Sequence, residues 1–250
     1  MGAARAILCS VGRGPHQADA TLFSPAIVPT LREAVADLGW LLGRGYVDPS
    51  ATKLVGDRYR LRQRQRIAVS RSAAGELSLQ HRASRQRAPA SLEGDRLAID
   101  AFNVIIGVET ALAGGVLLRG ADGALRDLSS VHGSYRRVAV TEAALDALCA
   151  TIATWGPAAV AWFVDRPVSN SGRLAGWIRE RAPEGLAWTV ELPHDADVAV
   201  IESDAVACSA DARILEQAPA WANLVSATVA ERVPQAWIVE LRPDPAGLVG

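Results

Sequence analysis

Short apolar runs that end in an aspartate constrain the fold of this chain more than any other feature of its sequence. Residues 97–99 are Leu, Ala and Ile, the run ends on Asp100, and Asn103 stands just before a second apolar segment. Such a run, followed by a polar residue that opens a helical pattern, indicates a buried strand with a carboxylate at its carboxyl end. Ligands bind at that edge in open α/β sheets. Asp100 and Asn103 would equally serve as plain helix caps, so this stretch alone leaves both interpretations open.

The alternation of strand and helix continues to the end of the chain. We expect strands at residues 97–100, 159–164, 188–192, 205–208 and 236–241, with a hairpin formed by 115–118 and 124–128. Helical patterns separate the strands and begin near residues 103, 141, 169, 211 and 222. Short, continuously apolar strands that alternate with helices predict an α/β fold, a parallel Rossmann-like sheet in three layers. Because no glycine-rich loop follows the first strand, the phosphate-binding loop and the dinucleotide fingerprint are excluded.

Aspartates recur where these strands are expected to end. They are Asp100, Asp165, Asp197 and Asp211. Each one alone is more often a cap than a ligand, but parallel strands deliver all four to one edge of the sheet. Two carboxylates about 4 Å apart repel each other by roughly 4 kcal/mol near a protein surface, and a divalent cation is the usual compensation. Oxygen ligands without His or Cys predict Mg²⁺ or Mn²⁺ rather than Zn²⁺.

The first part of the chain has a different character. Apolar residues at helical spacing predict a helix from about 24 to 43 and a shorter one at 50–56. Residues 87–95 read as a linker by composition. We therefore expect a small helical, arginine-rich domain over residues 1–88 and the α/β domain over residues 95–250.

Basic residues are concentrated between residues 53 and 87, which hold ten Lys or Arg against two acids. If residues 57–71 form a strand, the first five arginines lie on one face. If they form a helix, which two glutamines slightly favour, these arginines lie in two stripes. Because acids that could form ion pairs are scarce nearby, we expect a basic surface that faces nucleic-acid phosphates. Its contacts would be Arg58, Arg62, Arg64 and Arg66.

Composition sets the general class. The chain has 250 residues, 50% of them hydrophobic and 21% charged, which indicates a globular protein with a net charge of −1. Three cysteines, odd in number and far apart, form no disulfide framework and fit a reducing compartment. Neither a signal peptide nor an apolar run long enough to cross a bilayer is visible. We therefore expect a cytoplasmic protein without a membrane partner.

Four short motifs carry a resemblance to a known superfamily. They are Asp100-Ala-Phe-Asn103, Phe163-Val-Asp165, Asp195-Ala-Asp197 and Cys208-Ser-Ala-Asp211. In order and strand position they resemble the acidic motifs of the PIN-like nucleases, especially the NYN branch, although Ser209 and Ala210 stand where that pattern has Thr and a polar residue. The resemblance implies hydrolysis of phosphodiester bonds, in RNA more than in DNA, with Mg²⁺ or Mn²⁺ held by the four aspartates and Asn103 orienting a ligand or water.

The whole chain also resembles domain-of-unknown-function family 434 with its C-terminal companion domain. The matching stretches are RGYVDPSATKLVGDRYRLRQRQR, LLRGADGALRDLSSVHGSYRRV and VDRPVSNSGRL. In the last of these, Arg166, Asn170 and Arg173 could contact phosphates at a helix start or act only as caps and surface charge. The polar segment 125–137 reads as a substrate-contacting loop, with Arg136 and Arg137 as its basic contacts.

The sequence leaves three functions open. The first is a metal-dependent nuclease. The second is a nucleic-acid-binding protein whose metal site has decayed, and the third is a metal-dependent enzyme for a small phosphorylated substrate. Glu109, further along the helix that follows Asp100, would either support the metal ligands or face solvent.

Overall fold

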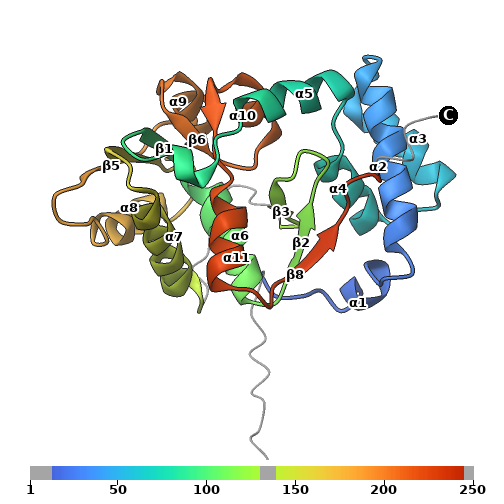
Figure 1. Ribbon diagram of the computed structural model, residues 1–250. Helices are drawn as coiled ribbons and strands as arrows, with labels where there is room; N and C mark the ends of the chain where they lie inside the picture. The colour runs from blue at the N-terminus through green and yellow to red at the C-terminus, as the bar shows by residue number, and fades with distance from the viewer. Residues whose placement is uncertain (1–12, 130–138, 245–250) are drawn as a thin grey trace, which may run out of the picture.

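A five-stranded parallel sheet organises the second part of the chain (Figure 1). The computed structural model describes residues 13–129 and 139–244. The strand order is β5-β4-β1-β6-β7. Its strands are β1 (Arg96–Asp100), β4 (Ala159–Phe163), β5 (Ala187–Glu191), β6 (Val206–Cys208) and β7 (Ala220–Trp221). β1 lies at the centre, with Asp100 opposite Phe163 of β4 and Ile99 opposite Cys208 of β6. The predicted α/β class with a parallel sheet is confirmed.

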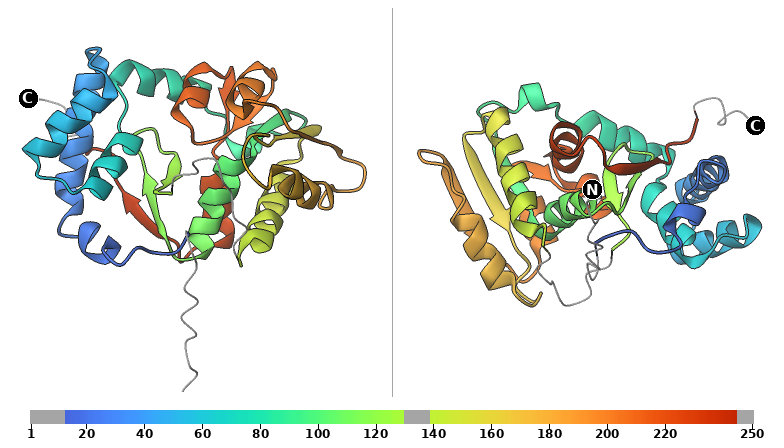
Figure 2. Two further views of the ribbon diagram at one scale, coloured as in Figure 1. Left: turned by 180° about the vertical axis from the view of Figure 1, so that it is seen from behind. Right: turned by 90° about the horizontal axis from the view of Figure 1, so that it is seen from below.

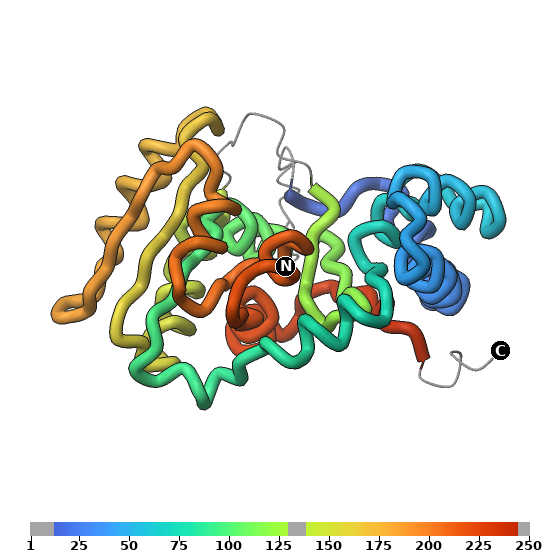
Figure 3. The backbone as a smooth tube through the Cα atoms, turned by 90° about the horizontal axis from the view of Figure 1, so that it is seen from above, coloured from blue at the N-terminus to red at the C-terminus, as the bar shows by residue number. Residues whose placement is uncertain are grey.

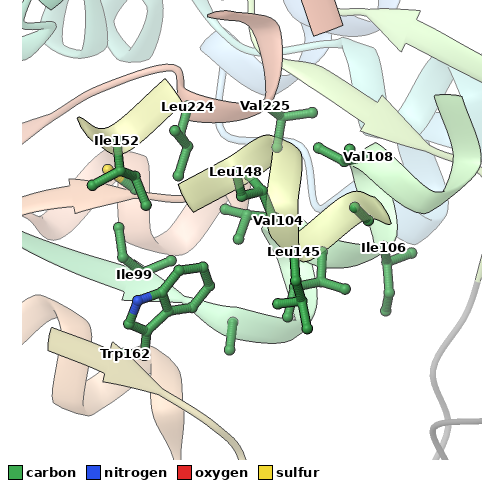
Figure 4. Close-up of a cluster of buried hydrophobic side chains, with 14 of the residues drawn as sticks. Ile99, Val104, Ile106, Val108, Leu145, Leu148, Ile152, Trp162, Leu224 and Val225 are labelled. Atoms are coloured by element: carbon green, nitrogen blue, oxygen red, sulfur yellow. The ribbon is translucent and has the colours of Figure 1, made fainter. Parts of the chain in front are cut away.

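Helices cover both faces of this sheet because successive residues of a strand point to opposite sides. Leu97 and Ile99 belong to a core that contains the helices α6 (Ala101–Leu112), α7 (Thr141–Trp155), α8 (Ser171–Arg179) and α11 (Leu224–Arg232). Figure 4 shows part of this core, with Ile99 and Trp162 beneath the helices. Ala98 belongs to the opposite core, which contains α9 (Ala196–Glu202) and α10 (Ala212–Gln217).

A second, three-stranded sheet has the order β3-β2-β8. It consists of β2 (Val116–Arg119), β3 (Leu125–Asp127) and β8 (Trp237–Glu240). The predicted hairpin is confirmed, because β2 and β3 pair antiparallel. The expectation that the last strand joins the large parallel sheet is wrong: β8 pairs in parallel with β2. An apolar run predicts a strand but not its partner, and here Val239 buries against the N-terminal helices instead.

The first part of the chain is helical, as expected. Its helices are α1 (Asp19–Leu22), α2 (Val28–Gly43), α3 (Asp48–Arg58), α4 (Gln63–Ser72) and α5 (Glu76–Arg85), followed by the short 3-10 turn η1 (Pro89–Ser91). The apolar side chains of α2 share one core with Val116, Leu118 and Val239 of the second sheet. The N-terminal helices therefore cover the three-stranded sheet, as Figures 2 and 3 show. The domain limits 1–88 and 95–250 stay a prediction.

The expectation of one helix through the arginine-rich stretch is wrong. α3 ends at Arg58 and α4 begins at Gln63. Between them Arg60 adopts a left-handed backbone with φ of 52°, and the amide of Leu61 donates back to the carbonyl of Gly56 (2.8 Å). These arginines therefore do not form regular stripes. Across the ranges that the structure describes, every helix is too short or too polar to cross a lipid bilayer.

Candidate functional site

The five residues that the sequence nominated as catalytic line one cavity at the carboxyl end of β1. This cavity, called the aspartate cavity below, has a volume of about 530 Å³. The five are Asp100, Asn103, Asp165, Asp197 and Asp211. Asp100 ends β1, Asn103 lies in the first turn of α6 and Asp211 is the N-cap of α10. Residues separated by more than a hundred positions are thus brought together.

The strand order explains why the cavity forms there. β1 is followed by α6, which lies on one face of the sheet, whereas β6 is followed by α10 on the other face. The chain therefore diverges between β1 and β6, and such a topological switch point opens a crevice at the carboxyl ends of the strands. Asp100 and Asp211 flank this crevice.

Hydrogen bonds hold the loop from Ser209 to Asp211 against β1 and α6. Ser209 Oγ donates to Asp100 Oδ2 (2.8 Å) and accepts from the amide of Asp211 (3.0 Å). The amide of Ala210 donates to Asn103 Oδ1 (2.8 Å). Ser209 was not nominated from the sequence, where it appeared only as a departure from the nuclease motif. Its place two residues before Asp211 in a turn was the available signal.

Two of the other three carboxylates bind backbone amides. Asp165 Oδ1 accepts from the amide of Ala196 (2.8 Å), and Asp211 Oδ1 accepts from the amide of Arg213 (2.8 Å). Asp197 lies 3.9 Å from the guanidinium of Arg213. Asp211 is therefore a helix cap as well as part of the cavity wall.

The acids of the cavity affect one another's ionisation. Burial raises the pKa of Asp100 to about 8; the hydrogen bond from Ser209 opposes this rise, and the charges of Asp197, Asp211 and Asp165 add to it. Burial likewise raises the pKa of Asp197 to about 6, with Asp211 the next largest cause. A cavity with these properties favours a proton or a cation.

Three arginines line the same cavity that were not named as contacts, although two lie in the basic stretch 53–87 and one in the predicted segment 125–137. They are Arg71, Arg82 and Arg126. Arg71 donates to the carbonyl oxygens of Asp127 and Ser129 (2.5 and 2.8 Å). Asp48 and Ser70 also line the wall. The N-terminal helices α3, α4 and α5 therefore complete a cavity whose four predicted metal-ligand aspartates come from the α/β part.

The expected scarcity of acidic partners for the predicted basic surface is wrong, because acids outside residues 53–87 pair with its arginines. Arg64 donates to both carboxylate oxygens of Asp19 (2.5 and 3.0 Å), and Arg58 lies 3.3 Å from Asp37. Arg66 donates to Asp57 (2.7 Å), an acid inside the stretch.

Arg62 caps α4 through its backbone amide, which donates to Gln65. These four arginines lie outside the lining of the aspartate cavity.

The remaining nominated residues lie apart from the cavity or outside the described residues. Arg166, Asn170 and Arg173 are exposed and do not line it. Asn170 is the N-cap residue of α8, with φ of 68°. Arg136 and Arg137, with most of the predicted loop 125–137, lie outside the described residues. The described part of that loop does line the cavity, through Leu125, Arg126, Asp127 and Ser129. Glu109 does not face solvent: it is fully buried and accepts from Arg13 and Thr141 (2.8 and 2.5 Å).

Comparison with known families shows where the chain belongs. Residues 89–227 match the family described as Domain of unknown function (DUF5616). The chain belongs to this family. The DUF5616 match includes β1, β4 and β6 and all five nominated residues. Residues 30–85 match the family described as Protein of unknown function (DUF434). The resemblance to family 434 with a companion domain is thereby confirmed.

One curated relative is similar over much of its length. The chain is 27% identical over 152 residues to Uncharacterized protein MJ0935 of Methanocaldococcus jannaschii. The aligned region covers 61% of this chain and 73% of that protein. No solved structure is significantly similar to the chain. The likeness to PIN-like nucleases therefore stays with the motifs and enters below as a proposal.

Proposed function

We propose that this chain is a metal-dependent nuclease that hydrolyses phosphodiester bonds, in RNA. One observation carries the proposal: four aspartates from separate elements line a single cavity at the switch point of a parallel sheet. Ligand sites of open α/β sheets lie at this place. RNA as the substrate, and the PIN-like assignment itself, rest on the resemblance of the acidic motifs.

The donor set of the cavity fits Mg²⁺ or Mn²⁺ in its chemistry. The ligands would be the carboxylates of Asp100, Asp165, Asp197 and Asp211, and hard cations prefer such oxygen ligands. Among residues 13–129 and 139–244, however, no three His, Cys, Asp or Glu side chains are already arranged to hold a metal ion. We therefore expect side chains of the cavity to turn when the cation binds, at the expense of the amide contacts of Asp165 and Asp211.

The roles of the chain's own residues follow from their contacts. A bound Mg²⁺ or Mn²⁺ supplies an activated water and stabilises charge that develops on the phosphate. Asn103 holds the loop that bears Asp211 through the amide of Ala210. Arg71, whose side chain is 31% exposed, gives the wall a positive charge that suits a substrate phosphate. The raised pKa of Asp100 means that cation binding must release a proton near neutral pH.

Two alternatives have an observation of their own. A cavity of about 530 Å³ also suits a small phosphorylated substrate. The second alternative is a nucleic-acid-binding protein with a decayed site, and the lack of a ready metal arrangement in the described residues bears on its metal site alone. Salt dependence separates the first alternative from a nuclease, because polynucleotide binding weakens steeply with salt. Calorimetric titration with Mn²⁺ separates the second, because a decayed site takes up no metal.

The direct test is incubation of the purified chain with pooled RNA, single-stranded DNA and duplex DNA, with Mn²⁺ or with chelator. We expect cleavage of RNA with Mn²⁺ and none with chelator. Asp165→Asn, which keeps the size of the side chain and removes its charge, is the matched variant and should be inactive. Cleavage by wild type in chelator would contradict the proposal, and so would cleavage by Asp165→Asn as strong as that by wild type. Either result would indicate a contaminating nuclease.

A further inference from the structure

Arg126 connects the second sheet to the loop that carries Asp211. The Nε of Arg126 donates to the carbonyl oxygen of Ala210 (2.8 Å). The backbone amide of Ala210 in turn donates to Asn103 Oδ1 (2.8 Å). Both backbone polar groups of Ala210 are therefore bound, one by a residue of β3 and the other by a residue of α6. Because Asp211 is the next residue in the chain, these two bonds constrain where its carboxylate can point.

Arg126 is itself held in place by a buried acid. Its two terminal nitrogens donate to the two oxygens of Asp122 (2.8 and 2.6 Å), whose side chain is 2% exposed. Burial works against the charge of Asp122, but Arg126 and Arg82 outweigh it and hold the pKa of this carboxyl below its usual value. Gly120 leaves room for the guanidinium, since a Cβ there would lie 2.6 Å from Arg126 Nη1. The pair is thus ionised, bidentate and closely packed.

Arg82 extends the same cluster into the N-terminal helices. It lies on α5 and donates to Asp122 (2.8 Å) and to Glu216 of α10 (3.1 Å). The carbonyl oxygen of Arg82 accepts from the indole of Trp221 (2.8 Å). α5 therefore contacts α10, the helix that Asp211 caps, and Figures 1 and 3 show the two side by side.

We propose that Arg126 and Arg82, joined through Asp122, are positioning residues that fix the Ser209–Asp211 loop, so that the N-terminal helices form part of the candidate active site. The consequence for metal affinity rests on the proposed function, whereas the restraint on the loop stands on the contacts alone. Groups that orient metal ligands from outside typically change affinity by roughly 10-fold to 100-fold when they are removed.

The test replaces Arg126 by Lys, which keeps the charge beside Asp122 but cannot bind Asp122 through two nitrogens and Ala210 at once. Arg181→Lys is a matched control, because Arg181 also binds one acid, Asp146 (2.7 Å), and one carbonyl, that of Trp177 (3.0 Å). Two quantities are measured in the full chain: hydrogen exchange of the backbone amides of residues 206–214, and Mn²⁺ affinity by calorimetry.

We expect faster exchange at Ala210 and Asp211 in Arg126→Lys and a Mn²⁺ affinity reduced roughly tenfold or more, with neither change in Arg181→Lys. Arg82→Lys should change both quantities in the same direction but less, because it acts through Asp122. Unchanged exchange in Arg126→Lys, or an equal change in Arg181→Lys, would overturn the positioning role. If the wild-type chain takes up no Mn²⁺, the proposed function fails, and the exchange data still decide on the restraint.

Discussion

The hydroxyl of Ser209 donates a 2.8 Å hydrogen bond to Asp100 Oδ2, and the two residues are only 3% and 5% exposed. The bond joins the ends of the parallel strands β6 and β1, where the helices that follow them diverge to opposite faces of the sheet. It stabilises the charged form of a carboxyl that burial and neighbouring acids push towards protonation. Ser209 Oγ also accepts from the amide of Asp211 (3.0 Å), so one hydroxyl is hydrogen-bonded to two of the proposed metal-ligand residues.

Ser209→Ala should destabilise the chain by about 1–3 kcal/mol, since it leaves the buried carboxyl of Asp100 and the part-buried amide of Asp211 without this partner. The pKa of Asp100 should rise further, because the hydrogen bond that lowers it is lost. Urea unfolding measures the first effect. Ser203→Ala is the control, because Ser203 Oγ donates only to the carbonyl of Val200 near the end of α9. Equal losses in the two variants would contradict a special role for Ser209.

Stability without metal should depend on pH through Asp100. Its pKa is raised from 3.8 to about 8 in the folded chain, so between these values the folded state binds more protons than the unfolded state. The free energy of unfolding therefore falls as the pH rises through this window and levels off above about 8. Thermal unfolding in chelator from pH 6 to 9 measures the slope. Asp100→Asn should flatten it, and an unchanged slope would contradict the pKa shift.

Two arginines of the basic region should differ sharply in their effect on stability. Arg64→Ala leaves Asp19, which is 0% exposed, as a buried carboxylate without its ion pair, and should cost about 2 kcal/mol or more. Arg58→Ala breaks a pair whose side chains are 71% and 44% exposed and should leave the stability almost unchanged. Similar urea midpoints for the two variants would show that Arg64 is only a surface residue.

A chain that begins at Ser91 should lose solubility or cooperative unfolding. Without the N-terminal helices, Val116, Leu118 and Val239 lose the core that covers them. Circular dichroism and thermal unfolding of the shortened chain test this expectation. A cooperative transition close to that of the full chain would show that residues 91–250 fold independently.

Much of the fold could be predicted from local patterns, because apolar runs and helix starts are encoded over a few residues. β1, β4, β5 and β6 lie where expected, and the acids at their ends line one cavity. The partner of β8 could not be predicted, since pairing depends on which surface remains to be covered. Ion pairs such as Arg64 with Asp19 were missed for the same reason: their partners lie 45 residues apart.

Basic residues of the cavity wall were harder still to identify. Arg82 and Arg126 belong to different parts of the chain and meet only at Asp122. No spacing in the sequence marks such a triad. The acids were identifiable because each ends a strand or follows one within a few residues, whereas the arginines reach the cavity from helices and from a second sheet.

Asp100 as a ligand of Mg²⁺ or Mn²⁺ is central to the proposed function, and one measurement tests this role most directly. The melting temperatures of wild type and Asp100→Asn are compared in chelator and in millimolar Mn²⁺. In chelator, Asp100→Asn should be as stable as wild type or more stable near pH 8, because charge repulsion in the cavity is relieved. With Mn²⁺, wild type should gain stability through ligand binding, and Asp100→Asn should gain much less. An equal Mn²⁺-dependent rise in both proteins would contradict the claim.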